Sequence, residues 1–183
     1  STAKILYTIY ILMTVVEMVF LLLGGMPLFD TLCLSFGTAG TGGFGIKNDS
    51  IASYSTYNQI VITVFMILFG VNFNAYYLLL SKKVMQAAKN EEVRYYLGII
   101  GLAIVAIAVN TRDMFTSFGR AFQQAAFQVG SIITTTGYAT TDFNVWPVFS
   151  KTILVILMFV GACAGSTGGG IKISRLLLLA KSV

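Results

Sequence analysis

The sequence predicts an all-α integral membrane protein made of tandem units, each with a membrane helix, a re-entrant helix, a loop and a second membrane helix. The first observation is composition: 56% of the residues are hydrophobic and only 10% are charged, whereas soluble domains carry about 25% charged residues. The second is two apolar runs, residues 5–23 and 60–80, each long enough to cross a bilayer as a helix. The third is a threonine- and glycine-rich stretch that occurs twice, at residues 37–49 and 130–142.

The apolar runs define four expected membrane helices. Residues 5–23 and 60–80 provide the two helices of a first unit. A shorter run covers residues 95–109, and another covers residues 146–160 and resumes at Leu176. We therefore expect a second unit with its own pair of helices.

The charge pattern predicts how the chain is oriented. The net charge is +5, and most basic residues cluster beside apolar runs, which is typical of cytoplasmic loops rather than of a nucleic-acid surface. If residues 82–94 are cytoplasmic, the loops around residues 47–49 and Asp142 lie on the opposite side. The clustered basic residues are Lys82, Lys83, Lys89 and Arg94, followed near the end by Lys172, Arg175 and Lys181.

No group of residues indicates catalysis or a metal centre of the protein's own. The chain contains no histidine, and it has no serine–histidine pairing and no close pair of aspartates in facing helices, so no catalytic residue is predicted. Cys33 and Cys163 stand far apart without metal-ligand spacing, and we expect both to be small buried residues. An enzyme is not expected.

The order of elements repeats along the chain. In the first unit, the short segment 27–36 precedes the threonine-glycine motif, and in the second the segment 116–129 does so. Both segments are too short to span a bilayer, so each is predicted to be a helix that enters and turns back. Pro27 with Asp30 signals the start of one, and Thr116 or Ser117 signals the start of the other.

Each motif reads Thr, any residue, Gly, aromatic, small residue, which is the order of a potassium-selective filter built from backbone carbonyls. Glycine allows successive carbonyls to point the same way, threonine adds a hydroxyl, and the aromatic ring can wedge against neighbouring helices. Oxygen ligands of this kind suit a hard alkali cation. Two ordinary polar turns are the alternative. The predicted K+-binding residues are Thr41, Gly42, Gly43 and Phe44, followed by Gly45, and Thr135, Thr136, Gly137 and Tyr138, followed by Ala139.

A third feature, residues 161–175, interrupts the last apolar helix. Five glycines in ten residues should break a helix, because each costs ~1 kcal/mol relative to alanine. A phosphate-binding loop is excluded because Ile171 separates Gly170 from Lys172. We expect a gate below the filter, with a close helix-packing site as the alternative. The predicted gate residues are Gly161, Ala164, Gly165, Ser166, Thr167, Gly168, Gly169, Gly170 and Lys172.

Several charged residues have open roles. Glu17 lies within the first apolar run, where an ionisable residue is a candidate for proton or ion coupling, although it could instead neutralise a basic residue on a neighbouring helix or face a wet crevice. Lys172 and Arg175 could reach the cytoplasmic interface, and Lys172 could also repel cations at a closed gate. Asp49 and Asp142 could concentrate cations at the outer mouth, or be ordinary solvated loop charges.

The motifs "TGGFGIKNDSI", "TTTGYATTDF" and "GACAGSTGGGIKISR", in this order, resemble those of the TrkH/KtrB superfamily of potassium transporters. The resemblance covers nearly the whole chain. It implies a multi-pass protein of the cytoplasmic (inner) membrane of a prokaryote, in which four units in one polypeptide surround a pore. Residues 1–90 would be the second unit and 91–183 the third, a partial pseudo-fourfold bundle like that of ion channels. The glycine-rich break belongs to the third unit, where it acts as a gate for potassium uptake.

The resemblance also implies partners. Two units are present where four are needed, so missing pore units or a second copy would complete the pore, and a homodimer is expected. The superfamily works with a TrkA-like cytoplasmic nucleotide-binding subunit. K+ is the transported ion, and no covalently bound cofactor is expected. A sodium-permeable relative and a secondary transporter that binds a small solute at broken helices remain alternatives, although the latter predicts inverted repeats.

Overall fold

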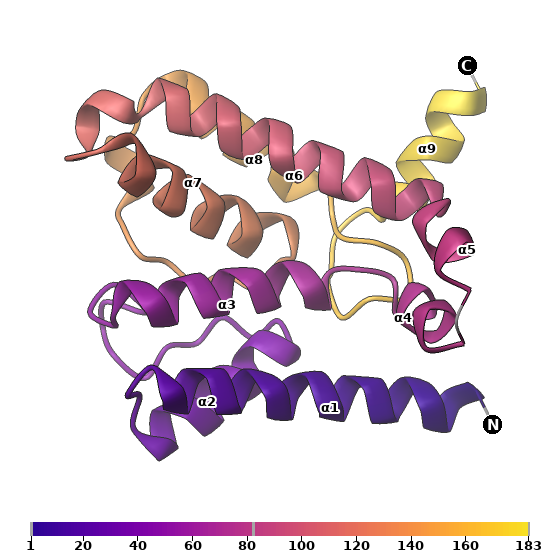
Figure 1. Ribbon diagram of the computed structural model, residues 1–183. Helices are drawn as coiled ribbons and strands as arrows, with labels where there is room; N and C mark the ends of the chain where they lie inside the picture. The colour runs from indigo at the N-terminus through magenta and orange to yellow at the C-terminus, as the bar shows by residue number, and fades with distance from the viewer. Residues whose placement is uncertain (1, 82, 183) are drawn as a thin grey trace.

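The structure, a computed structural model, describes residues 2–81 and 83–182, and every element assigned within them is a helix. The predicted all-α class is confirmed. Figure 1 labels the helices in chain order. They are α1 (Thr2–Leu23), α2 (Leu28–Ala39), α3 (Thr56–Phe69), α4 (Phe73–Leu80), α5 (Val84–Ala88), α6 (Glu91–Asn110), η1 (Arg112–Met114), α7 (Phe118–Ile133), η2 (Phe143–Val145), α8 (Val148–Phe159) and α9 (Ile173–Ser182).

Two helices are long and apolar enough to cross a membrane by themselves. They cover Ala3–Leu23 in α1 and Glu91–Asn110 in α6, so the second begins four residues before the apolar run that predicts it. Asn90 explains this earlier start, because its side chain accepts a hydrogen bond from the backbone N–H of Val93 and caps the helix. A third span forms if α3 and α4 are counted together.

The expected continuous helix over residues 60–80 is wrong. The chain there forms α3 and α4, which meet at an angle of 90°. The break has a local cause: Gly70 ends α3, and the side chain of Asn72 accepts a hydrogen bond from the N–H of Asn74 and starts α4. Mean hydropathy conceals this break because the residues on both sides are apolar.

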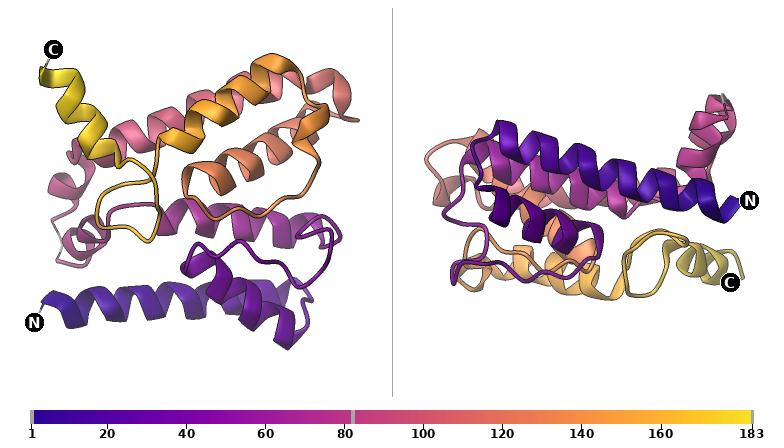
Figure 2. Two further views of the ribbon diagram at one scale, coloured as in Figure 1. Left: turned by 180° about the vertical axis from the view of Figure 1, so that it is seen from behind. Right: turned by 90° about the horizontal axis from the view of Figure 1, so that it is seen from below.

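The two repeats run in the same direction. We call α1 to α5 the first repeat and α6 to α9 the second. In Figures 1 and 2, α1 and α6 start at the same end of the molecule, and α3 and α8 return toward that end. The re-entrant helices α2 and α7 start at the opposite end and stop near the middle. This arrangement differs from the inverted repeats of broken-helix transporters.

The re-entrant helices start close to their sequence signals. Ser117, rather than Thr116, caps α7 by accepting a hydrogen bond from the N–H of Arg120. Pro27 occupies the position before α2, where its fixed backbone suits a helix start. Asp30 does not cap α2; its carboxylate accepts a hydrogen bond of 2.7 Å from the Tyr54 hydroxyl. Burial, followed by this bond to Asp30, raises the pKa of Tyr54.

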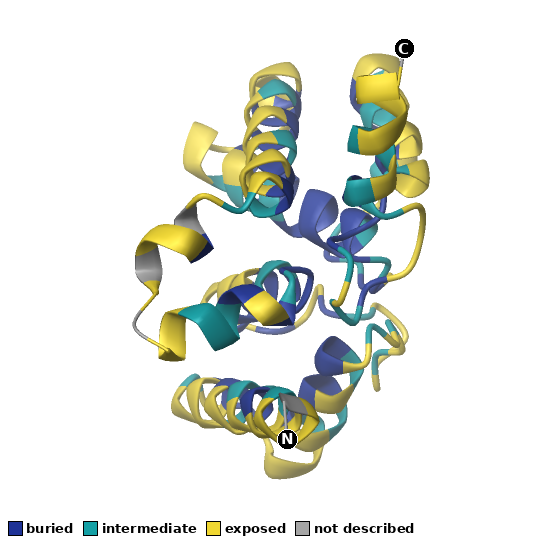
Figure 3. Ribbon diagram, turned by 90° about the vertical axis from the view of Figure 1, so that its right-hand side faces the viewer, coloured by how far each residue is buried: buried dark blue, intermediate teal, exposed yellow. Residues whose placement is uncertain are grey.

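Each repeat has its own hydrophobic core, and the cores meet across α3 and α7, which pack together. Phe127 and Tyr138 of the second repeat belong to the core of the first. Figure 3 shows buried residues gathered toward the middle of the molecule and exposed ones on the outer faces. On α1 the outer residues are large and apolar, including Ile11, Leu12 and Val19, as a lipid-facing helix requires.

Candidate functional site

The two threonine-glycine segments have the same backbone conformation. We call residues 40–45 and 134–139 the filter-like loops. Thr41 and Thr135 have positive φ angles of 51° and 58°, and Gly43 and Gly137 have positive φ angles of 72° and 93°. Positive φ is costly for a β-branched residue, and such strain persists mainly at functional sites.

The two loops also share a hydrogen-bond pattern at matching positions. In each, the threonine N–H bonds to the carbonyl three residues earlier, and the next N–H bonds to the carbonyl five residues earlier. The first-repeat bonds are Thr41 to Thr38 (3.2 Å) and Gly42 to Gly37 (2.7 Å), and the second-repeat bonds are Thr135 to Ile132 (3.0 Å) and Thr136 to Ser131 (2.9 Å). Two turns formed by chance would not match so closely.

Most carbonyls of the filter-like loops have no hydrogen-bond donor within residues 2–81 and 83–182. An unpaired carbonyl is rare in a folded protein away from water, and it is the ligand that a dehydrated alkali cation needs. The Tyr138 carbonyl differs, because it accepts a hydrogen bond of 2.6 Å from the Ser131 hydroxyl. Among the eight predicted K+-binding residues, the unpaired carbonyls belong to Thr41, Gly42, Gly43, Phe44, Thr135, Thr136 and Gly137.

The loops lie side by side at Gly43. A Cβ on Gly43 would collide with the carbonyl of Thr136 and lie 3.1 Å from the Cα of Gly137. The Thr136 side chain takes no part in this approach, since its hydroxyl is hydrogen-bonded to that of Thr134 (2.8 Å). The structure therefore brings Gly43 of the first motif against the backbone of Thr136 and Gly137 of the second.

The aromatic residues of the two motifs differ. Tyr138 is buried and wedges against α2, where its hydroxyl donates a hydrogen bond of 3.1 Å to the Leu34 carbonyl. Phe44 was expected to wedge in the same way, but its side chain is 87% exposed. The difference is positional: Tyr138 reaches the re-entrant helix of the other repeat, and nothing described in this chain occupies the equivalent place beside Phe44.

The glycine-rich loop, residues 160–172, lies against the break between α3 and α4. The N–H groups of Cys163 and Thr167 donate to the carbonyls of Gly70 (3.1 Å) and Phe69 (3.4 Å), and the N–H of Phe73 donates to the Gly165 carbonyl (3.1 Å). The two interruptions thus satisfy each other's backbone groups, which a membrane interior requires. Figure 2 shows the loop, in yellow, between the repeats.

The same loop contacts both filter-like loops through their strained threonines. Thr41 donates its hydroxyl hydrogen to the Thr167 carbonyl (3.3 Å). Thr135 accepts a hydrogen bond of 2.6 Å from the N–H of Gly169. The threonine hydroxyls therefore face the glycine-rich loop.

Lys172 closes the glycine-rich loop. Its ammonium group donates hydrogen bonds to the carbonyls of Gly168 and Gly169, so it stabilises the loop and places a positive charge there. Arg175 is exposed on α9. The roles expected for both residues, repulsion of cations and contact with the interface, stay predictions.

In the described chain, no hydrogen bond joins the side chains of the other charged candidates to the filter-like loops. The side chain of Asp142 accepts a hydrogen bond from the N–H of Asn144, and that of Asp49 accepts one from the Ser53 hydroxyl, both in exposed loops. Glu17 is fully buried on α1, which packs against α2, and neither of its carboxylate oxygens has a hydrogen-bond partner in the described chain.

Sequence reasoning missed Glu92 and the break at residues 70–72. Gly70 and Asn72 within an apolar run are a usable signal for the break. Glu92 gives no such signal, since it follows Glu91 in a charged segment that reads as a loop and helix start. Its partners, described below, come from three distant parts of the chain.

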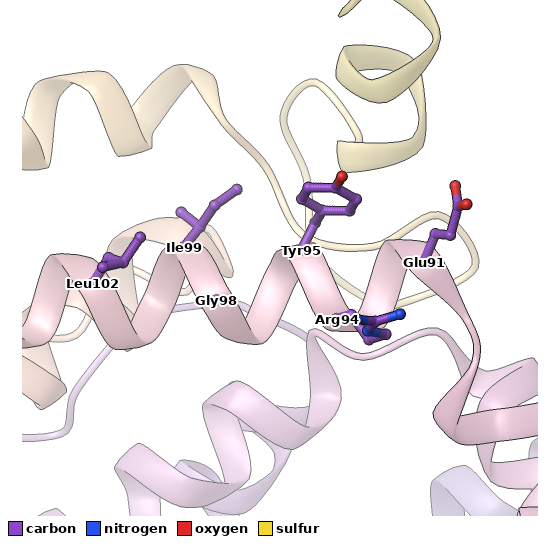
Figure 4. Close-up of a pocket in the computed structure, with 6 residues that line it drawn as sticks. All are labelled: Glu91, Arg94, Tyr95, Gly98, Ile99 and Leu102. Atoms are coloured by element: carbon purple, nitrogen blue, oxygen red, sulfur yellow. The ribbon is translucent and has the colours of Figure 1, made fainter. Parts of the chain in front are cut away.

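A groove on α6 is separate from the site. Glu91 and Arg94 form its charged end, and no filter-like loop residue lines it (Figure 4). No cluster of metal-ligating side chains occurs in the described part of the chain either. A cation site in the described part of the chain would therefore depend on backbone carbonyl and hydroxyl oxygens. The groove is lined by Glu91, Arg94, Tyr95, Gly98, Ile99 and Leu102.

Known potassium-uptake proteins are similar to this chain over nearly its whole length. The model of the TrkH family, described as a cation transport protein, matches residues 95–183. The chain is 37% identical to the Trk system potassium uptake protein TrkH of Salmonella typhimurium, over 99% of this chain and 38% of that protein. The chain belongs to the TrkH/KtrB superfamily.

Related proteins match over a similar length. The chain is 32% identical to the Trk system potassium uptake protein TrkG of Escherichia coli, over 99% of this chain and 38% of that protein. The crystal structure of the potassium transporter TrkH from Vibrio parahaemolyticus superposes with a TM-score of 0.91 at 36% identity, over 98% of this chain and 40% of that one. The chain thus spans about two fifths of the length of the superfamily members it matches.

Proposed function

We propose that this chain forms part of a potassium-uptake pore in the cytoplasmic membrane of a prokaryote. The observation that supports it best is the pair of filter-like loops with matching strained backbones and seven carbonyls that lack a donor in the described chain. Backbone carbonyls arranged in this way replace the water shell of a potassium ion. Ions pass down their electrochemical gradient, and no chemical bond is made or broken.

The filter-like loops supply the ion ligands. The carbonyls of Thr41, Gly42, Gly43 and Phe44 act with those of Thr135, Thr136 and Gly137, and Tyr138 braces the second loop through its ring. K+ is preferred over Na+, because Gly43 and Gly137 leave the carbonyls free to converge. A second pair of such loops completes the ring, supplied by further units or by a second copy of the chain.

The glycine-rich loop is the gate. It lies against the threonines of both filter-like loops, and hydrogen bonds of this kind can break and reform at modest cost. In this arrangement the loop obstructs the ion path, and its displacement opens the path. Residues 1–90 act as the second pore unit and residues 91–183 as the third.

We further propose that the complete protein is a homodimer regulated by a TrkA-like nucleotide-binding subunit on the cytoplasmic side. In Figure 1, α5, the start of α6 and α9, which carry or adjoin Lys83, Lys89, Arg94, Arg175 and Lys181, lie at one end of the molecule, and positively charged ends of this kind face the cytoplasm.

Potassium-dependent growth tests this function. The complete gene that encodes this chain is expressed in a bacterium that lacks its own potassium-uptake systems, with Gly137→Ser and a deletion of residues 164–169 beside it. We expect the unaltered gene to rescue growth at low potassium, Gly137→Ser to lose potassium over sodium selectivity, and the deletion to leak cations. Failure of rescue together with absence of rubidium flux would refute the proposal.

A further inference from the structure

Glu92 is a buried carboxylate at the edge of the glycine-rich loop. It lies in the first turn of α6, and its residue is only 9% exposed. One carboxylate oxygen accepts hydrogen bonds from the backbone N–H groups of Ala164 (2.6 Å) and Ser174 (3.2 Å). The other accepts one from the side-chain amide of Asn72 (3.2 Å).

These three partners come from separate elements. Ala164 belongs to the glycine-rich loop, Ser174 to the first turn of α9, and Asn72 caps α4. The starts of α4, α6 and α9 therefore meet at one negative charge. A carboxylate is favoured there because helix N-termini carry partial positive charge and unpaired N–H groups.

The hydrogen bonds to Glu92 explain how its charge can be buried. No lysine or arginine in the described chain forms a salt bridge with Glu92, and the nearby Lys172 donates to loop carbonyls instead. Three hydrogen bonds, two of them from backbone N–H groups, stabilise the charge in place of a basic residue. Loss of the carboxylate would leave the N–H groups of Ala164 and Ser174 without their acceptor.

We propose that Glu92 is the positioning residue of the glycine-rich loop. Its carboxylate fixes the loop, α9 and α4 in one arrangement, in which the loop lies against Thr41 and Thr135. Movement of α9 is transmitted to the loop through this residue, and loss of the carboxylate frees the loop. The expectation that loss of the carboxylate increases ion flux rests on the proposed gate function of the loop.

The neighbouring buried cysteine offers a readout that does not depend on transport. Cys163 is fully buried and directly precedes Ala164, so displacement of the loop exposes its thiol. Cys33 and any other cysteine of the complete protein are replaced, and the rate at which Cys163 reacts with a water-soluble methanethiosulfonate reagent is measured in detergent. Rubidium flux into proteoliposomes is measured on the same preparations.

Four variants separate positioning from general damage. Glu92→Ala removes both acceptor oxygens. Glu92→Gln keeps one carbonyl acceptor but turns an N–H donor toward the Asn72 amide. Adding Asn72→Asp to Glu92→Gln restores the bond with donor and acceptor exchanged, and aspartate also caps α4. Glu91→Gln is the matched control, because Glu91 lies one residue away and forms an exposed pair with Lys181.

The predicted order is clear. Cys163 should react about tenfold faster in Glu92→Ala, the factor expected when a charge-assisted hydrogen bond is lost. Glu92→Gln should lie between Glu92→Ala and the unaltered protein. The pair Glu92→Gln with Asn72→Asp, like the Glu91→Gln control, should react nearly as slowly as the unaltered protein. Rubidium leak should follow the same order.

The outcomes distinguish the two proposals. If labelling follows this order but no preparation carries rubidium, the loop inference holds and the transport function fails. If the unaltered protein carries rubidium but labelling and leak are unchanged in Glu92→Gln and Glu92→Ala, the loop inference is overturned. If Glu92→Ala does not fold, the comparison of Glu92→Gln with the exchanged pair decides, and equal labelling of the two overturns it.

Discussion

The hydroxyl of Tyr138 donates a hydrogen bond of 3.1 Å to the backbone carbonyl of Leu34, so the filter-like loop of the second repeat is fixed to the re-entrant helix of the first. Tyr138 is 1% exposed, and Leu34 is fully buried. The ring passes directly over Gly37, where a Cβ would collide with the tyrosine hydroxyl. The geometry of one filter-like loop therefore depends on a glycine in the other repeat.

The first prediction concerns this contact. Gly37→Ala should displace the Tyr138 ring and lower stability by ~1–3 kcal/mol, the usual cost of overpacking a buried site. Tyr138→Phe removes the colliding oxygen, so the double variant should recover part of that loss. Thermal unfolding of the purified protein measures both. Equal stability of Gly37→Ala and the unaltered protein would show that the ring is not held as described.

The second prediction ranks the two filter glycines. Alanine at Gly43 meets the Thr136 carbonyl as well as an unfavourable positive φ, whereas at Gly137 the nearest atom to a new Cβ is 3.9 Å away. Both changes carry backbone strain of ~1–2 kcal/mol, but Gly43→Ala adds a steric collision. Rubidium flux should fall further in Gly43→Ala than in Gly137→Ala. The reverse order would contradict the close approach of the two loops.

The third prediction concerns the Thr135 hydroxyl, which accepts a hydrogen bond from the Gly169 N–H. Thr135→Val keeps the shape and removes the acceptor, so the glycine-rich loop should open about fivefold more often, as expected for the loss of one hydrogen bond. Thr135→Ser keeps the hydroxyl and is the control. Rubidium leak under unstimulated conditions measures opening. Leak in the serine variant equal to that in the valine variant would argue against this bond.

The fourth prediction concerns Glu17. Its carboxyl is fully buried on α1, which packs against α2, and neither carboxylate oxygen has a hydrogen-bond partner in the described chain. A coupling group must exchange protons with water along the ion path. We therefore expect Glu17→Gln to leave the pH dependence of rubidium uptake unchanged between pH 6 and 8. At each pH, the uptake rate of the variant should lie within about twofold of that of the unaltered protein, as for an ordinary conservative substitution. A shift in the pH profile would restore proton coupling as an explanation.

The features that the sequence predicts well are those with a local cause. The threonine-glycine motifs and the glycine-rich break each depend on residues whose backbone preferences are intrinsic. The start of α7 at Ser117 follows from capping, which needs only neighbouring residues. These positions could be found without knowing what packs around them.

The features that the sequence does not predict depend on distant partners. The break between α3 and α4 lies within an apolar run. Its carbonyls at Phe69 and Gly70 accept hydrogen bonds from the glycine-rich loop, which lies far along the chain. Backbone groups inside a membrane need such partners. Glu92 is set by partners on three elements. Although the two motifs are alike, Tyr138 is buried against α2, whereas Phe44 has no such helix beside it in the described chain and is exposed.

The most direct test of the central claim is to locate the ion. Crystals of the complete protein that contains this chain are soaked in rubidium or thallium, and anomalous scattering shows where the cation lies. We predict density between the carbonyls of residues 41–43 and those of residues 135–137, which is lost in Gly43→Ala. Cation density confined to other sites, with these carbonyls empty at saturating rubidium, would contradict the account.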